Sequence, residues 1–280
     1  MQSPGRIDLH AHTNVSDGTE SPSRLVAAGL AAGLSQVAIT DHDTTAGWDE
    51  AFAAAEGTNL GVVPGIELST QLDEASVHVL GYFLDPTDAD LITITTKLRN
   101  DRVDRAMRIV ERLAQDVEIT WEDVVAQTPP GATVGRPHIA DALVARRIVA
   151  DQSEAFKEML NRRSSYYVPH SQAPLPVEGV KLIVAAGGVA IIAHPAAAGN
   201  AMLFDDAQFR TLVQAGLGGL ELHHRDNEMD LLPKWVAWAT DYDLIVTGSS
   251  DWHGSRKSNL LGEHYTDPAQ FARIVERATR

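Results

Sequence analysis

The chain has 280 residues, of which 44% are hydrophobic, and its formal net charge is −15. This length fits one large domain or one domain with an insertion. The acidic charge argues against long nucleic acid as a partner, and the absence of cysteine excludes disulfides, cysteine-ligated zinc and thiol nucleophiles. Because the sequence has neither an apolar run of about eighteen residues nor a secretory leader, we expect no membrane span and a cytoplasmic location.

The first predicted element is a short buried strand that ends in two histidines, in the stretch Ile7-Asp8-Leu9-His10-Ala11-His12. Residues two apart in a strand point to the same face, so His10 and His12 converge on one point, which suits a metal site. Two exposed histidines in a loop are the alternative. Asp17 follows in a polar, turn-prone segment, where the alternative is a plain Asp-Gly turn.

Further apolar runs, each typical of a buried strand, end at residues of metal-binding type. Helical segments separate these runs, and such alternation indicates a parallel α/β architecture. The runs cover residues 37–40, 62–66, 188–193, 219–220 and 244–250 and lead to His42, Glu67, His194, Glu221, and Asp251 with His253. The carboxyl ends of parallel strands meet on one face of a barrel, so we expect these residues to surround one site. His78 is the exception, because it lies near the beginning of a predicted strand, 77–83, and reaches the site only if that strand returns to the same rim.

The composition changes between residues 86 and 174. Apolar residues recur at every third or fourth position from 98 to 116, which predicts a long amphipathic helix, and shorter helices follow. We therefore predict a barrel built from residues 1–85 and 175–280, with a mainly helical insertion, 86–174, that covers its mouth as a lid. We interpret the arginines of the long helix as a solvated, salt-paired face. They are Arg99, Arg102, Arg105 and Arg108.

Together the motifs resemble those of the PHP (polymerase and histidinol phosphatase) family of metal-dependent phosphoesterases. They are Asp8-Leu9-His10-Ala11-His12, Ser16-Asp17-Gly18, Thr40-Asp41-His42-Asp43, Gly65-Ile66-Glu67, His194-Pro195 and Gly248-Ser249-Ser250-Asp251-Trp252-His253. The resemblance extends over nearly the whole chain except the helical insertion. It implies an α/β fold, a distorted (β/α)7 TIM-like barrel with seven strands rather than eight, and a trinuclear metal site.

The resemblance also implies which residues hold each metal. The first metal would be bound by His10, His12, Glu67 and Asp251, the second by Glu67, His78 and His194, and the third by Asp17, His42 and His253. Asp17 stands where some members have histidine. Histidine and carboxylate ligands without thiolate fit manganese, iron or zinc, so we expect two to three such divalent ions as cofactors. Clustered dications neutralise phosphoryl oxygens and lower the pKa of a bridging water, and we count Asp17 and His253 among the catalytic residues.

Two other segments are candidates for contact with substrate. Gly135-Arg136-Pro137-His138 begins a predicted helix and resembles a segment whose arginine and histidine face the substrate phosphate in one branch of the family. A guanidinium and a helix N-terminus both suit phosphate, and a surface cap is the alternative. Glu221 with His224 resembles the family's Glu-x-x-His element, so His224 would contact substrate or protonate the leaving group, with an indirect role behind the metal ligands as the alternative.

We therefore predict a phosphoesterase that removes a terminal phosphate from a small phosphorylated substrate by means of a metal-activated hydroxide. The branch with Ser-Asp-Gly and Gly-Arg-Pro-His resembles nucleotide phosphatases, including those that convert a nucleoside 3',5'-bisphosphate to the 5'-monophosphate. Hydrolysis of histidinol phosphate and 5'-3' exonuclease action on short oligonucleotides are the alternatives within this chemistry. A metal-binding module without catalysis is the alternative from another class, and the complete set of ligands disfavours it. The oligomeric state is left open.

Overall fold

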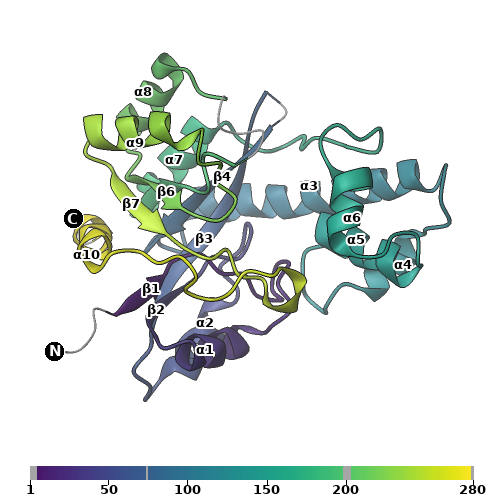
Figure 1. Ribbon diagram of the computed structural model, residues 1–280, viewed down its shortest axis with the longest axis horizontal. Helices are drawn as coiled ribbons and strands as arrows, with labels where there is room; N and C mark the ends of the chain where they lie inside the picture. The colour runs from purple at the N-terminus through teal and green to yellow at the C-terminus, as the bar shows by residue number, and fades with distance from the viewer. Residues whose placement is uncertain (1–4, 74, 198–202, 279–280) are drawn as a thin grey trace.

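The computed structural model describes residues 5–73, 75–197 and 203–278, and Figure 1 shows the arrangement of its elements. One seven-stranded sheet has the order β1-β2-β3-β4-β5-β6-β7. The strands are β1 Arg6–Asp8, β2 Leu34–Ile39, β3 Gly61–Leu72, β4 Ala75–Tyr82, β5 Val189–Ile192, β6 Gly219–His223 and β7 Ile245–Gly248. All neighbouring pairs are parallel except that β4 is antiparallel to both β3 and β5. The prediction of a parallel α/β fold is confirmed for most of the sheet and is wrong for β4.

Helices connect the strands and form a separate group near residues 86–174. The α-helices are α1 Pro22–Ala31, α2 Trp48–Ala55, α3 Ala89–Leu113, α4 Trp121–Ala126, α5 Arg136–Ala145, α6 Gln152–Glu154, α7 Pro176–Ala185, α8 Asp206–Gln214, α9 Leu232–Asp241 and α10 Pro268–Ala278, with a π-helical turn, η1 Ala155–Leu160, and a 3-10 turn, η2 Gly254–Arg256. Within the described ranges, none of these helices has the length and apolar character needed to cross a membrane.

Side chains pack on both faces of the sheet, as the strand period of two requires. Val37 and Ile39 of β2 belong to the large core that the sheet forms with its helices, whereas Ala38 belongs to a smaller core on the opposite face. That smaller core draws on residues of β1, β2, β3, β4, β5 and β7 and on Ile274 of α10. The Tyr82 hydroxyl donates a hydrogen bond of 2.8 Å to the carbonyl of Leu9 on this face.

Helix α3 is longer than the amphipathic pattern predicts and belongs to two cores. It begins at Ala89 because the Asp88 side chain accepts a hydrogen bond from the Leu91 backbone N–H, a standard N-cap. Leu91 and Leu98 pack in the core beneath the sheet, and Ile109 packs in a second core formed with α4, α5 and η1. In Figure 1, α3 accordingly runs from the sheet to the group of α4, α5 and α6.

Candidate metal centre

The polar residues that follow the strands meet at one edge of the sheet. Parallel backbone pairing continues past the strands in two isolated bridges, Ala11 with Trp252 and His42 with Glu67. The first bridge joins the loops after β1 and β7, and the second joins the loop after β2 to Glu67 within β3. The predicted ligands His10, His12, Asp17, His42, Glu67, Asp251 and His253 are all buried there. His78 and His194 are partly exposed at the same edge.

The first cluster consists of His10, His12, Glu67 and Asp251, whose ligand atoms all lie within 4.8 Å of one another. Oε2 of Glu67 is 3.3 Å from Nε2 of His10 and 3.0 Å from Nε2 of His12. Oδ1 of Asp251 is 3.4 and 3.3 Å from the same two nitrogens. Four donors therefore converge on one small volume, and among them His10 and His12 converge as their spacing predicts.

The second cluster brings His78 to Glu67. Because β4 runs antiparallel to β3, His78 pairs with Ser69, two residues beyond Glu67, and so returns to the edge where the parallel strands end. Nδ1 of His78 lies 2.8 Å from Oε1 of Glu67, and Nε2 of His194 lies 3.4 Å from the same oxygen. A compact group of potential ligands combines Glu67 and His78 with His42.

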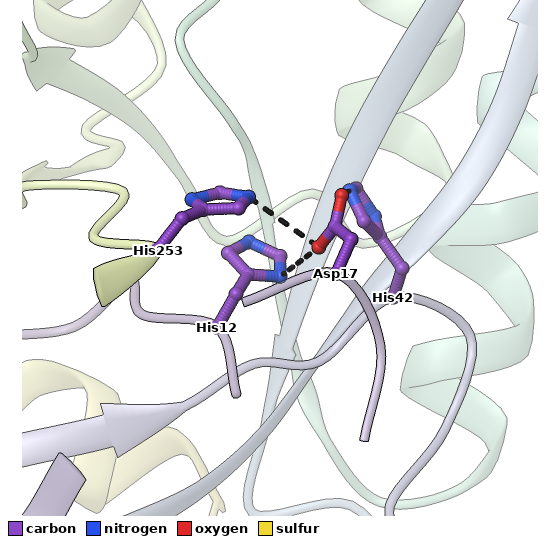
Figure 2. Close-up of side chains that lie close together, drawn as sticks. All are labelled: His12, Asp17, His42 and His253. Atoms are coloured by element: carbon purple, nitrogen blue, oxygen red, sulfur yellow. Dashed lines mark ion pairs between the residues drawn. The ribbon is translucent and has the colours of Figure 1, made fainter. Parts of the chain in front are cut away.

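The third cluster surrounds Asp17, as Figure 2 shows with His12, His42 and His253. Oδ1 of Asp17 is 3.4 Å from Nε2 of His253 and 3.5 Å from Nδ1 of His12. Oδ2 is 3.7 Å from Nε2 of His42. The resemblance implied a third set without His12, whereas the His12 ring lies between the first and third clusters. A further grouping of His224, Asp226 and Asp251 shares Asp251 with the first cluster.

The chemistry of these donors fits divalent cations. Nδ1 of His42 and Oε1 of Glu67 are buried and have no hydrogen-bond partner among the described residues. Nδ1 of His42 nevertheless lies 3.1 Å from Oε2 of Glu67, and Oε1 of Glu67 lies 2.8 Å from Nδ1 of His78. The atoms thus face a shared volume without the geometry of a hydrogen bond. Burying several carboxylates together is costly unless cations balance them, and imidazole with carboxylate is a common ligand set for transition metals.

The electrostatics keep the carboxylates ionised. Burial opposes ionisation of Asp17, but His42 and His253 more than offset it and hold the pKa of this carboxyl well below its usual range. Burial also opposes ionisation of Asp251. Lys257 and then other neighbours more than offset it, so the pKa of Asp251 is likewise well below its usual range. The pKa of His42 is well below its usual value because of its burial. Ionised carboxylates and a neutral imidazole are the forms that bind metals.

Burial acts against protonation of His10 and His12, but the carboxylates around them outweigh it and raise the pKa of His10 well above its usual value and that of His12 to about 9. A metal ion would therefore displace protons from these two rings.

A second layer of contacts orients the ligands. Glu221 accepts a hydrogen bond of 3.1 Å from Nδ1 of His10, which leaves Nε2 of His10 directed at the first cluster. The same carboxylate accepts from the His194 backbone N–H at 2.9 Å. Such carboxylate–histidine pairs fix the tautomer and the ring orientation of a metal ligand.

In both candidate substrate residues, His138 and His224, Nδ1 accepts a hydrogen bond from a backbone N–H. The Gly135 backbone N–H donates to Nδ1 of His138 at 3.1 Å, and the Asp226 backbone N–H donates to Nδ1 of His224 at the same distance. Each Nε2 therefore carries the proton, and each is buried without a hydrogen-bond partner. Burial and, secondly, nearby Arg256 lower the pKa of His138 to about 4. Both side chains offer an unused N–H donor. The alternative of a surface cap is right in that His138 caps α5 through Nδ1, and wrong in that the ring is fully buried.

Arg136 is half-buried at the start of α5. Its Nη1 donates to the Leu160 carbonyl at 3.2 Å, and its guanidinium lies 5.8 Å from the centre of the Phe156 ring. Both contacts are with residues of η1, and neither neutralises its charge.

The prediction of a solvated arginine face on α3 is wrong for three of its members. Arg99 is partly buried and donates to the Asp43 carbonyl at 2.6 Å. Arg102 donates to Oδ2 of Asp43 at 2.9 Å and to Oγ of Ser69 at 2.8 Å. Arg105 is buried and donates to the Val168 carbonyl at 2.5 Å. The periodicity identifies residues that share a helix face. In the structure that face packs against the loop after β2 and against the segment between η1 and α7. Arg108 is exposed, as predicted.

Two basic residues near the centre carry no sequence motif. Nζ of Lys257 lies 2.6 Å from Oδ2 of Asp251. Arg256 donates to the Asp17 carbonyl and to the Asp141 carboxylate, so it links the loop of the third cluster to α5. Their one signal in the sequence is their place just after His253, in the loop beyond the last strand.

Residues 8–165 match the family described as PHP domain. The chain belongs to this family. A 5'-3' exoribonuclease of Haemophilus influenzae is 31% identical over 89% of this chain and 90% of its own length. A 3',5'-nucleoside bisphosphate phosphatase of Chromobacterium violaceum is 29% identical over 97% of this chain and 95% of its own.

A solved structure agrees with these relatives. A protein of Bifidobacterium adolescentis named as a metal-dependent phosphoesterase has a TM-score of 0.92 and 42% identity, with coverage of 97% of this chain and 96% of its own. The comparisons confirm the predicted family and the predicted class of enzyme, a metal-dependent hydrolase of phosphoric esters.

Proposed function

We propose that this PHP enzyme hydrolyses a phosphomonoester of a small nucleotide, with a nucleoside 3',5'-bisphosphate as substrate and the nucleoside 5'-monophosphate as product. The observation that carries the proposal is the convergence of buried histidines and carboxylates at one edge of the sheet, beside Nε2 of His224, whose proton has no acceptor. The Chromobacterium violaceum relative, which spans nearly the whole chain, supports this choice of substrate.

Two to three divalent ions of manganese, iron or zinc fit the clusters. The residues that would hold them are His10, His12, Asp17, His42, Glu67, His78, His194, Asp251 and His253. When bound, such ions neutralise phosphoryl oxygens and activate water as a nucleophile.

The chain's own side chains orient the substrate. The guanidinium of Arg136 pairs with a phosphate oxygen through charge-assisted hydrogen bonds. The Nε2–H groups of His138 and His224 donate to phosphate oxygens or to the leaving oxygen, because both rings are held in this tautomer by backbone N–H groups. Glu221 and Lys257 keep His10 and Asp251 in place, and Asp17 and His253 complete the catalytic set.

We also infer that the sheet closes into a distorted (β/α)7 TIM-like barrel of residues 1–85 and 175–280. The His12 N–H donates to the Trp252 carbonyl at 2.8 Å, which joins the loops after the first and last strands. Residues 86–174 act as the helical lid, and the contact of Arg256 with Asp141 supports their docking over the centre. A cytoplasmic location stays a prediction.

The second candidate function is 5'-3' exonuclease action on short oligonucleotides, which the Haemophilus influenzae relative favours. Hydrolysis of histidinol phosphate is the remaining alternative within the same chemistry. These reactions use the same centre and differ in what the neighbouring surfaces bind.

The test combines elemental analysis of protein purified without chelators with phosphate release after reconstitution with manganese, iron or zinc. The substrates are adenosine 3',5'-bisphosphate, 3'-AMP, histidinol phosphate and 5'-phosphorylated oligoribonucleotides. A preference for the bisphosphate supports the proposal. Stepwise release of mononucleotides instead supports the exonuclease, and loaded protein without activity on any of these esters contradicts both.

A further inference from the structure

A basic cavity lies between β4 and the helices that follow α3. Its volume is about 1000 Å³, and its lining includes Ser76 of β4 together with Arg136, Lys157, Arg162, Arg163 and Tyr167. Four cationic side chains and one acidic side chain, Glu158, are among the lining residues. The lining of this cavity is thus positively charged, although the chain as a whole has a net charge of −15.

The ring of His78 lies between the wall of the basic cavity and the metal centre. Oγ of Ser76 lies 2.9 Å from Nε2 of His78, and Nδ1 of the same ring lies 2.8 Å from Oε1 of Glu67. On the other side Arg136, the candidate phosphate partner, belongs to the lining. The cavity and the centre are therefore neighbours, with the His78 ring and Arg136 between them.

Most of these cations have no carboxylate partner in the part of the chain that the structure describes. Arg136 and Arg162 donate to backbone carbonyls, those of Leu160 and Asp73, at 3.2 and 3.0 Å. No hydrogen bond or ion pair is found for the guanidinium of Arg163 among the described residues. Lys157 pairs with Glu158 at 3.1 Å, where both side chains are exposed and the pair contributes little.

Further positive charge lies behind Arg136. Burial and the neighbouring Arg136 lower the pKa of Arg105 to about 9. Burial, followed by nearby Arg102, likewise lowers the pKa of Arg136 itself. Arg102 is paired with Asp43, but Arg105 has no carboxylate at salt-bridge distance among the described residues, and a bound anion next to Arg136 would relieve the repulsion between Arg136 and Arg105.

We propose that the basic cavity binds a second phosphate group of the substrate while the first lies at the metal centre. This inference rests on the proposed function and specifies its substrate class, nucleotides with at least two phosphate groups. Arginine forks bind phosphate oxygens in pairs and with direction. A cavity of about 1000 Å³ leaves space for part of a nucleoside beside the phosphate. The second group is either the 5'-phosphate of a nucleoside 3',5'-bisphosphate or a backbone phosphate of a short oligonucleotide.

The experiment compares wild-type enzyme with Arg162→Ala/Arg163→Ala and Arg163→Glu, and uses Arg24→Ala as a control. Arg162 and Arg163 are exposed, so their replacement spares the core, and Arg24 is an exposed arginine on α1. The substrates are 3'-AMP, adenosine 3',5'-bisphosphate and 5'-phosphorylated triadenylate, assayed with the metal that gives the highest activity. Thermal unfolding of each variant checks its fold.

We expect the double variant to lower the ratio of kcat/KM for a substrate with two or more phosphates to kcat/KM for 3'-AMP by about tenfold, equivalent to about 1.4 kcal/mol. Arg163→Glu lowers the ratio at least as much, and Arg24→Ala leaves it unchanged. A loss with the bisphosphate identifies the 5'-phosphate as the bound group, and a loss with triadenylate alone identifies a backbone phosphate.

An unchanged ratio for every substrate in both variants overturns the proposal. A wild-type enzyme that prefers 3'-AMP to both longer substrates overturns it as well. If the metal-loaded wild-type enzyme hydrolyses none of the three, the proposed function itself fails, and this outcome is distinct from the other two.

Discussion

Oε1 of Glu221 lies 3.1 Å from Nδ1 of His10, and both side chains are buried. The carboxylate thereby holds His10 with Nε2 towards the other donors of the first cluster. Replacement of Glu221 by glutamine keeps the size of the side chain and removes its charge. We expect metal affinity to fall by about 10- to 100-fold.

Titration of metal-free protein with manganese or zinc measures this effect. Glu228→Gln serves as the control because Glu228 is an exposed residue in the loop after β6. Equal affinity in the Glu221 and Glu228 variants would show that Glu221 does not orient His10.

Loss of a ligand at the centre has a larger effect. His10→Ala, Glu67→Ala or Asp251→Ala each removes a donor from the first cluster, and we expect phosphate release to fall by at least about a thousandfold, equivalent to about 4 kcal/mol. Phosphate release and metal content are measured on the same preparations. His264→Ala is the matched control outside the clusters, and wild-type turnover in the Glu67 variant would refute the assignment.

Arg136→Ala separates substrate binding from metal binding. The guanidinium contacts a carbonyl and an aromatic ring but no described carboxylate, so its charge is available for phosphate. We expect kcat/KM to fall by about 10- to 100-fold with an unchanged metal content. Steady-state kinetics and elemental analysis provide the two readouts. Unchanged kinetics would reduce Arg136 to a structural role at the start of α5.

His170 gives the fold a pH-dependent contribution. Its Nδ1 donates to Asp101 at 2.8 Å, and Arg105 donates to its Nε2 at 3.2 Å, an arrangement that suits only the neutral ring. Burial lowers the pKa of His170 to about 4, from 6.5. Between these values the unfolded chain binds a proton that the folded chain does not. The free energy of unfolding therefore decreases as the pH falls from about 6.5 to about 4, by up to about 3 kcal/mol.

Denaturant unfolding at a series of pH values checks this contribution. In His170→Gln the amide donates to Asp101 and accepts from Arg105 without titrating, so we expect a flatter profile in this range. The Asp101 carboxyl, whose pKa is about 2, loses its contribution only below pH 3.8 and does not overlap with this window. A His170→Gln profile identical to that of wild type contradicts the prediction.

The grouping of these histidines and carboxylates could be predicted because it depends on strand positions and residue spacing, which are local features of the sequence. His10 and His12 are two residues apart just beyond β1, and the apolar run before Asp251 locates the end of β7. Glu67 lies inside β3, which continues to Leu72, so the apolar run before it does not locate the end of its strand. The direction of β4 was not predictable, because an apolar run has the same appearance in a parallel and in an antiparallel strand.

Contacts between distant segments were harder to predict. The period of α3 identifies Arg102 and Arg105 as neighbours on a helix, but it does not show what packs against them. His170 has no motif around it, and it is buried only because Asp101 and Arg105 meet it from α3. Lys257 lies in a loop, where spacing does not predict which side chain reaches Asp251.

Helix α3 makes residues 86–174 inseparable from the rest of the molecule. Leu91 and Leu98 at its beginning complete the core under the sheet, and Arg102 in its middle binds Asp43, next to His42. Excision of the segment would therefore open a gap in the main core and release a loop of the metal centre. The segment is therefore not an exchangeable module, because its replacement would disturb the main core and the loop that carries His42 at the same time.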